Sequence, residues 1–227
     1  MHKWKHKISR LYKLNNKIMK IDISDVHEAS QALLGISQEL TNCGKLEQIL
    51  LNVCVDYSEQ QYEDLGKAIK QCKMINLFIN NPFHTPNLKK FIKQISYLNK
   101  VELLELYLQQ NWYNKNLSLY FENLQEIAKL SNLKTLIISL NNSREFINMK
   151  SDVKKIQQFG DQISNLKNLI YIKIDFGPIN TYNKYSGVEL DNQIILPLRS
   201  FFIKNKKIIL IKISYNRFDP YEGSTYE

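Results

Sequence analysis

The 227-residue sequence has few of the residues that build catalytic loops and metal sites: seven glycines, four histidines and three cysteines. The glycines are scattered and form no phosphate-binding loop or nucleophile elbow. The histidines form no HExxH motif. The three cysteines are an odd number with no CxxC pair and no neighbouring histidine, which argues against a disulfide framework or a zinc site. We therefore expect a non-enzymatic protein with no catalytic residue, cofactor or metal, in a reducing intracellular compartment.

Long hydrophobic runs are also missing, and no apolar stretch approaches the ~20 residues that span a bilayer. The composition, 44% hydrophobic and 11% aromatic, is still rich enough for a continuous core. We expect a soluble protein that has neither a membrane nor a small-molecule substrate as a partner.

Acidic residues are absent from the first 21 positions, which carry seven lysines and arginines. Two interpretations of residues 1–17 remain open. The favoured one is a basic N-terminal cap or arm in a cytoplasmic protein. The other is a mitochondrial transit peptide. The net charge of +9 raises the question of nucleic acid, although lysine, asparagine and isoleucine are abundant throughout the chain.

An internal repeat organises most of the sequence. An apolar residue, here called the anchor, is followed by further apolar residues three, five and seven positions later, as in Leu133, Leu136, Ile138 and Leu140. This alternation is typical of a strand with one buried face. The predicted anchors are Ile18, Leu46, Met74, Val101, Leu133, Leu169 and Ile208, with spacings of 28, 28, 27, 32, 36 and 39 residues.

Each strand is preceded by a helical stripe. Apolar residues stand six positions before the last six anchors (Leu40, Ala68, Ile95, Ile127, Ile163, Phe202) and nine or ten before them (Ile36, Leu65, Ile92, Leu124, Phe159, Leu198). Units of strand, turn and helix bury their apolar faces only by stacking. We expect an α/β solenoid of about seven repeats over residues 18–216, with a curved parallel sheet on the concave side, helices on the convex side, and a tail at 217–227.

The pattern resembles the leucine-rich-repeat family, whose strand signature L-x-x-L-x-L-x-x-N/C places Asn or Cys eight residues after the anchor. Cys54, Asn141 and Asn216 occupy that position, whereas Val26, Pro82, Gln109 and Gly177 depart from it. The period of about 28 residues resembles the ribonuclease-inhibitor-type branch. The resemblance implies that Cys54, Asn141 and Asn216 bind backbone groups where the chain leaves the strand, and that Cys43 and Cys72 have structural roles.

Candidate binding residues lie between the buried strand positions, on the predicted concave face. The apolar ones are Leu50, Phe78, Leu103, Tyr107, Ile137 and Tyr171, with Glu105 and Lys173 among them. Contiguous exposed apolar groups with a polar rim mark binding surfaces, although a weakly selected surface is the alternative. Insertions at about 109–116, 141–152 and 177–192 share one edge of the solenoid and add Trp112 and Tyr113.

These residues favour a protein–protein interaction scaffold or adaptor, a subunit of a larger assembly, whose protein partner the sequence does not identify. The first alternative is a nucleic-acid-associated accessory subunit that docks RNA or DNA through lysines such as Lys204, Lys206 and Lys207. The second is a regulatory subunit that caps an enzyme.

Overall fold

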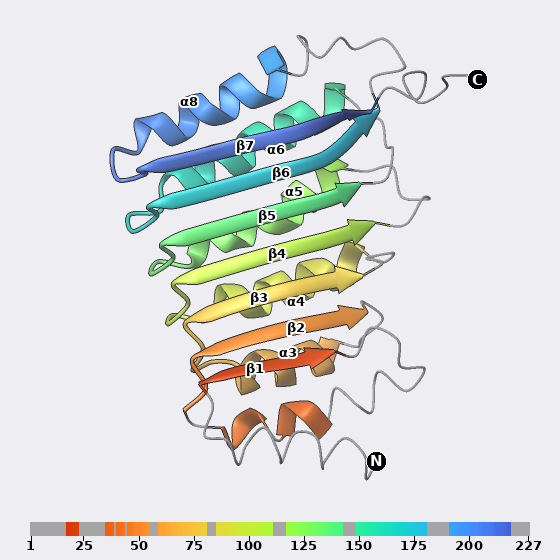
Figure 1. Ribbon diagram of the computed structural model, residues 1–227, viewed down its shortest axis with the longest axis vertical. Helices are drawn as coiled ribbons and strands as arrows, with labels where there is room; N and C mark the ends of the chain where they lie inside the picture. Colours follow the sequence, from red (N-terminus) through yellow and green to blue (C-terminus); the bar gives the residue numbers. More distant parts are fainter. Residues whose placement is uncertain are drawn as a thin grey trace, which may run out of the picture.

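The computed structural model describes residues 17–22, 35–38, 40–43, 45–54, 59–80, 85–110, 117–142, 149–180 and 191–218. These residues form two layers, a sheet in front and helices behind it (Figure 1). The predicted N-terminal cap, most of the tail, and the insertion residues Trp112 and Tyr113 lie outside the described residues.

The sheet is parallel throughout, and the order of its strands in space follows their order in the sequence. Its strands are β1 (Ile18–Asp22), β2 (Gln48–Cys54), β3 (Met74–Asn80), β4 (Leu103–Gln110), β5 (Thr135–Asn142), β6 (Tyr171–Asn180) and β7 (Leu210–Phe218). Helices lie between consecutive strands in the sequence: α3 (Glu59–Ala68), α4 (Thr85–Ser96), α5 (Leu117–Leu124) with the 3-10 helix η1 (Gln125–Lys129), α6 (Met149–Ser164), and the π-helix η2 (Asp191–Ile195) followed by α8 (Leu196–Lys204). Residues 35–38 and 40–41 are also helical. The predicted α/β repeat architecture is confirmed.

One continuous core fills the space between the layers. All twelve predicted helix-stripe residues are buried, none more than 6% exposed. Strand residues such as Ile49, Leu104 and Leu136 meet them from the sheet and are fully buried. The helix stripes were therefore predicted correctly.

The predicted register of the first and third repeats was wrong by two residues. Ile18 is 53% exposed and Met74 is half-buried, whereas Met19 and Ile75 are buried. The backbone N–H of five predicted anchors donates to the carbonyl three residues earlier; these anchors are Leu46, Val101, Leu133, Leu169 and Ile208. In the third repeat Cys72, not Met74, makes this bond, so Cys72 is the anchor there. The error arose because side chains alternate with period two, so a shift of two residues leaves the pattern of buried and exposed positions unchanged.

The correction alters two inferences from spacing. From Leu46 on, the anchors are spaced 26, 29, 32, 36 and 39 residues apart, so the even 28-residue period does not hold. The correction also places Asn80 eight residues after the anchor Cys72, where the family signature has Asn or Cys. Asn80 is in register with Cys54 and Gln109, which occupy the same position in their repeats.

The third insertion begins inside a strand. β6 continues through Gly177 to Asn180, with an irregular register between Asp175 and Pro178. The predicted loop at 177–192 therefore starts later than expected.

No described helix is long and apolar enough to cross a membrane. Within the same described residues, no three His, Cys, Asp or Glu side chains gather where they could hold a metal ion.

Candidate interaction surface on the open face of the sheet

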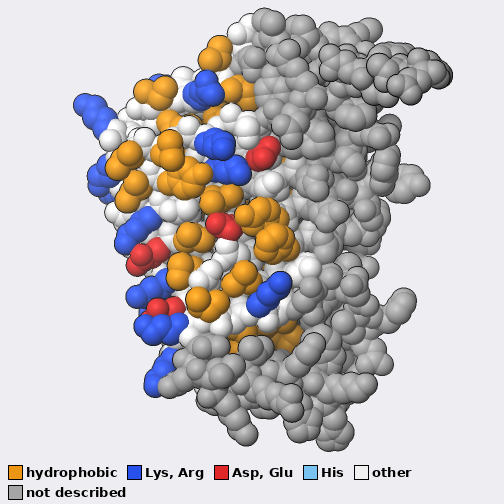
Figure 2. Space-filling view, in the orientation of Figure 1, with side chains coloured by type: hydrophobic (Ala, Val, Ile, Leu, Met, Phe, Trp, Pro, Cys, Tyr) orange, Lys and Arg blue, Asp and Glu red, His pale blue; other side chains and the backbone are white. Residues whose placement is uncertain are grey.

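The helices cover one face of the sheet, and the other face, here called the open face, is turned toward the viewer in Figures 1 and 2. Strand register arranges its side chains in rows that run across the sheet. The first row reads Ile18, Gln48, Met74, Leu103, Thr135, Tyr171, Leu210; the second reads Lys20, Leu50, Asn76, Glu105, Ile137, Lys173, Lys212; the third reads Asp22, Asn52, Phe78, Tyr107, Ser139, Asp175, Ser214.

Eight of the ten predicted binding residues lie on this face: Leu50, Phe78, Leu103, Glu105, Tyr107, Ile137, Tyr171 and Lys173. Phe78 is 38% exposed, and the other seven are half-buried. Hydrophobic side chains spread over the middle strands, with single acidic and basic groups among them (Figure 2). The face is therefore largely apolar and mixed in charge.

The two-residue correction changes which of these residues meet. With Met74 as the anchor, Phe78 would align with Leu50 and Glu105, and Asn76 with Gln48 and Leu103. The observed register instead puts Asn76 in the second row and Phe78 in the third. Phe78 consequently lies beside Tyr107, and the two rings stack with centroids 4.3 Å apart and planes 4° apart. Stacked aromatic pairs are worth about 0.5–1.5 kcal/mol beyond the area they bury.

A polar network runs beside the aromatic pair. Gln48 Nε2 donates to Asn76 Oδ1 at 3.0 Å, and Asn76 Nδ2 donates in turn to Glu105 Oε2. The Tyr107 hydroxyl donates to the same carboxylate oxygen at 3.3 Å. The network crosses β2, β3 and β4 and holds Tyr107 and Glu105 in fixed orientations. The role of Asn76 was missed because its predicted row separated it from Glu105.

Burial raises the pKa of Tyr107, and the charge and hydrogen bond of Glu105 raise it further. The phenol therefore stays protonated and donates to the carboxylate throughout the physiological range. The arrangement offers an aromatic surface with an oriented carboxylate acceptor beside it.

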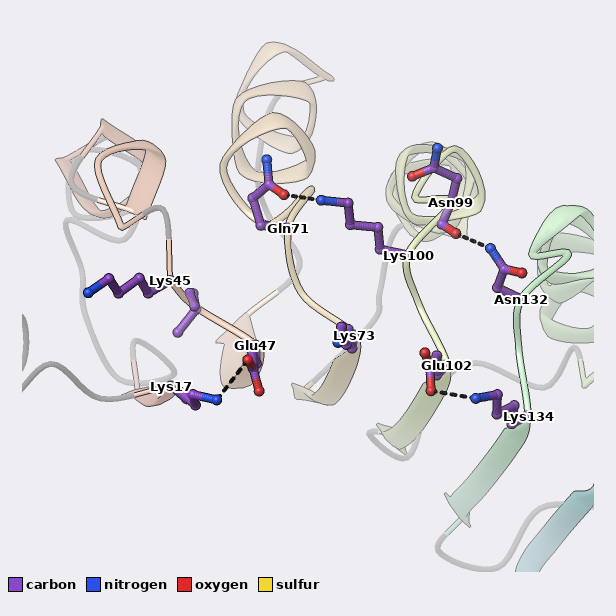
Figure 3. A pocket seen from close by; sticks show the side chains of 11 residues that line it. Lys17, Lys45, Glu47, Gln71, Lys73, Asn99, Lys100, Glu102, Asn132 and Lys134 are labelled. Atoms are coloured by element: carbon purple, nitrogen blue, oxygen red, sulfur yellow. Dashed lines mark hydrogen bonds and ion pairs between the residues drawn. The ribbon is translucent and has the colours of Figure 1, made fainter.

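A second surface, which the sequence analysis missed, follows the edge where the strands begin. In the first five repeats, the residues just before the strands alternate in charge: Lys17, Glu47, Lys73, Glu102 and Lys134. Their backbone groups form a continuous ladder of hydrogen bonds. Lys17 Nζ lies 3.0 Å from Glu47 Oε1, and Lys134 Nζ lies 2.8 Å from Glu102 Oε2 (Figure 3). The alternation is visible in the sequence only after the two-residue correction of the first and third repeats.

This charged row lines a shallow groove of about 630 Å³, to which Lys45 and Lys100 add positive charge. Lys100 Nζ donates to Gln71 Oε1 at 2.5 Å, and Asn132 Nδ2 donates to the Asn99 carbonyl at 2.5 Å. A hydrogen bond from Lys134 and its charge lower the pKa of Glu102, and the charge of Lys73 lowers it further. Most charges in the groove are thus engaged with each other.

No family model matches the chain, and no curated protein matches it. Among solved structures it is similar to a chain titled "Crystal structure of Rad7 and Elc1 complex in yeast". That match has a TM-score of 0.31 and 12% identity and covers 93% of this chain and 71% of the other. It is also similar to a "GH5-4 broad specificity endoglucanase from an uncultured bacterium", with a TM-score of 0.24 and 10% identity, covering 92% and 76%. Both likenesses are too distant to indicate a family or a function.

Proposed function

We propose that this chain is a leucine-rich-repeat-type solenoid that serves as a non-enzymatic scaffold or adaptor, a subunit of a larger assembly. It binds a partner protein through the open face, which is the concave face of that fold. The observation that carries the proposal is the Phe78–Tyr107 stack, which exposes an aromatic surface beside the carboxylate of Glu105.

The side chains around the stack support a binding role. Leu50 and Ile137 lie in the neighbouring second row, and Leu103 and Tyr171 in the first. Aromatic residues ordered before binding lose little conformational entropy when a partner covers them, which is why they dominate binding energies at interfaces. Trp112 and Tyr113 are included in the proposed surface on the basis of the sequence pattern alone, which places them on the insertion edge.

The repeat register supports the family assignment. Cys54, Asn80, Gln109 and Asn141 lie side by side in register, eight residues after the anchors Leu46, Cys72, Val101 and Leu133. Three of these four residues are the Asn or Cys of the family signature.

A quantitative pull-down tests the interaction surface. Phe78→Ala and Tyr107→Ala should each weaken partner capture about thirtyfold, which corresponds to about 2 kcal/mol at a binding hot spot. Lys154→Ala, an exposed change on α6, is the matched control and should leave capture unchanged. Thermal melts followed by circular dichroism would show that all three variants fold. Capture that survives both aromatic changes but is lost with Lys154→Ala would place the interface on the helices and contradict the proposal.

The groove favours one second candidate, a nucleic-acid-associated accessory subunit. Its lining holds five lysines against two glutamates. Phosphate contacts by lysines would give RNA or DNA binding that weakens steeply with salt. A filter-binding titration across salt concentrations tests this, with Lys45→Gln and Lys73→Gln in the groove compared with Lys204→Gln on α8. Absence of binding at low salt would remove the candidate.

A further inference from the structure

The last repeat is less well sealed than the repeats before it. The anchors Leu46, Cys72, Val101, Leu133 and Leu169 are at most 4% exposed, but the equivalent Ile208 is half-buried. The position three residues after the anchor shows the same difference. It is fully buried in the five preceding repeats (Ile49, Ile75, Leu104, Leu136 and Ile172), but Ile211, its equivalent in the last repeat, is half-buried. The hydrophobic core therefore reaches solvent beside β7.

Both layers of this repeat expose further large apolar groups. Where the chain enters the sheet, Ile209 is 82% exposed, and Leu210, the first residue of β7, is 57% exposed. On α8, Leu196 and Ile203 are 51% and 69% exposed, and their spacing of seven residues places them on the same side of the helix. β7 and α8 lie together at one end of the molecule (Figure 1). Capping repeats of solenoids have a polar outer face, whereas the described residues of this repeat expose large apolar groups, as an interface does.

β7 is also an edge strand. Among the described residues it pairs with β6 alone, so the backbone groups along its outer side have no ladder partner there. An open edge of this kind accepts an added strand from another protein, which gains affinity from main-chain hydrogen bonds. Neither a lipid surface nor a nucleic acid supplies that ladder of peptide groups.

The charge of the repeat selects the partner. Residues 192–218 contain no Asp or Glu, and their basic residues are Arg199, Lys204, Lys206, Lys207, Lys212 and Arg217. A second copy of this chain would bring the same positive charges to the contact. An acidic partner would instead gain from charge complementarity.

We infer that the terminal repeat, β7 with α8, is a docking site for an acidic protein segment that adds a strand along β7. The acidic side chains of the added strand lie on the open-face side, beside Lys212. Its apolar side chains lie on the helix side, against Ile211 and Ile213, because strand residues alternate between faces. This site is separate from the Phe78–Tyr107 surface and does not depend on it.

Fluorescence anisotropy with a labelled peptide of alternating Glu and Val, about eight residues long to match a typical strand, tests the site. Two peptides serve as controls: one of alternating Lys and Val, and a Glu–Val peptide N-methylated at alternate residues, which keeps the side chains but loses ladder donors. The Glu–Val peptide should bind at least about tenfold more tightly than either control.

Two protein variants and one matched control complete the test. Lys212→Glu should weaken Glu–Val binding at least about tenfold and improve Lys–Val binding, since the charge beside β7 is reversed. Ile209→Ser, a change to a largely exposed side chain, should also weaken it. Lys93→Glu, exposed on α4, should leave the affinity unchanged.

Four results would overturn the inference. Equal affinity for the N-methylated peptide would show attraction of charge without strand addition, and unchanged binding by Lys212→Glu would place the site elsewhere. A dimer in analytical ultracentrifugation that Ile209→Ser dissolves would make a second copy the occupant. Co-sedimentation with phosphatidylserine vesicles that Ile203→Ser abolishes would make it a membrane surface.

Discussion

Ile75 and Met74 are neighbours in β3 whose side chains lie on opposite faces of the sheet. Ile75 is fully buried in the core, and Met74 is half-buried on the open face. We predict that Ile75→Asp lowers the free energy of unfolding by more than about 3 kcal/mol, because it places an unpaired charge in a packed core. Met74→Asp, the matched control, should cost less than about 1 kcal/mol. Urea unfolding followed by circular dichroism measures both values, and a larger loss for Met74→Asp would contradict the corrected register.

Cys72 fills an anchor position, and its chemistry follows from burial. Burial raises the pKa of its thiol to about 12, and the nearby Cys43 adds to the shift. Because the thiolate is the reactive form, we predict that iodoacetamide alkylates Cys72 far more slowly than the half-buried Cys43 in the native protein at pH 8. Peptide mapping by mass spectrometry compares the two sites, and equal rates would contradict the burial of Cys72.

The same shift has a consequence for stability. The folded protein holds the Cys72 proton more tightly than the unfolded chain does, so this contribution to stability is complete below about pH 9 and is lost as the pH rises toward 12. The raised pKa of Tyr107 acts in the same direction.

Among the elements, the charged row at the strand starts links β1 to β5. Glu102 lies between Lys73 and Lys134 in this row and hydrogen-bonds to Lys134. We predict that Glu102→Lys, which places three lysines in succession, lowers the free energy of unfolding by about 0.5–1 kcal/mol at low ionic strength. The loss should shrink in 1 M salt, where the Debye length is about 3 Å.

Glu63→Lys on α3 is the control for this substitution. Glu63 Oε2 lies 3.7 Å from Lys67 Nζ on the helix surface, and Asp64 Oδ1 lies 3.9 Å from the same amine. Because Lys67 keeps the Asp64 contact, Glu63→Lys should cost less than Glu102→Lys. Urea unfolding at two salt concentrations measures both variants. A Glu102→Lys loss that is the same at both would show that charge alternation does not stabilise the row.

At the scale of the whole molecule, the repeats should differ in local stability. A repeat in the middle of a solenoid is covered on both sides, whereas a terminal repeat has one neighbour. We predict that backbone amides of β4 and β5, whose core residues are fully buried, exchange with deuterium most slowly. Those of β7 should exchange much faster, because Ile208 and Ile211 are half-exposed to solvent. Hydrogen exchange followed by mass spectrometry resolves the strands, and uniform protection from β4 to β7 would contradict the open end.

The sequence by itself determined the two layers, the parallel strand order and the inward faces of the helices that carry the stripe residues. Apolar period two in strands and period 3.6 in helices are local properties, and twelve helix positions chosen on them are all buried. The composition of the open face followed as well, since the residues between the buried strand positions must point away from the core.

Only the tertiary structure decided which strand residues stand side by side. A shift of two residues preserves the alternation, so the register of β1 and β3 depends on pairing with neighbouring strands. The Phe78–Tyr107 stack, the Asn76–Glu105 contact and the alternating charges at the strand starts all follow from that pairing. The exposure of Ile208 and Ile211 also depends on tertiary structure. The last repeat has the same apolar pattern as the others, but a pattern of this kind is fully buried only where a neighbouring repeat covers it. The local sequence does not specify that neighbour.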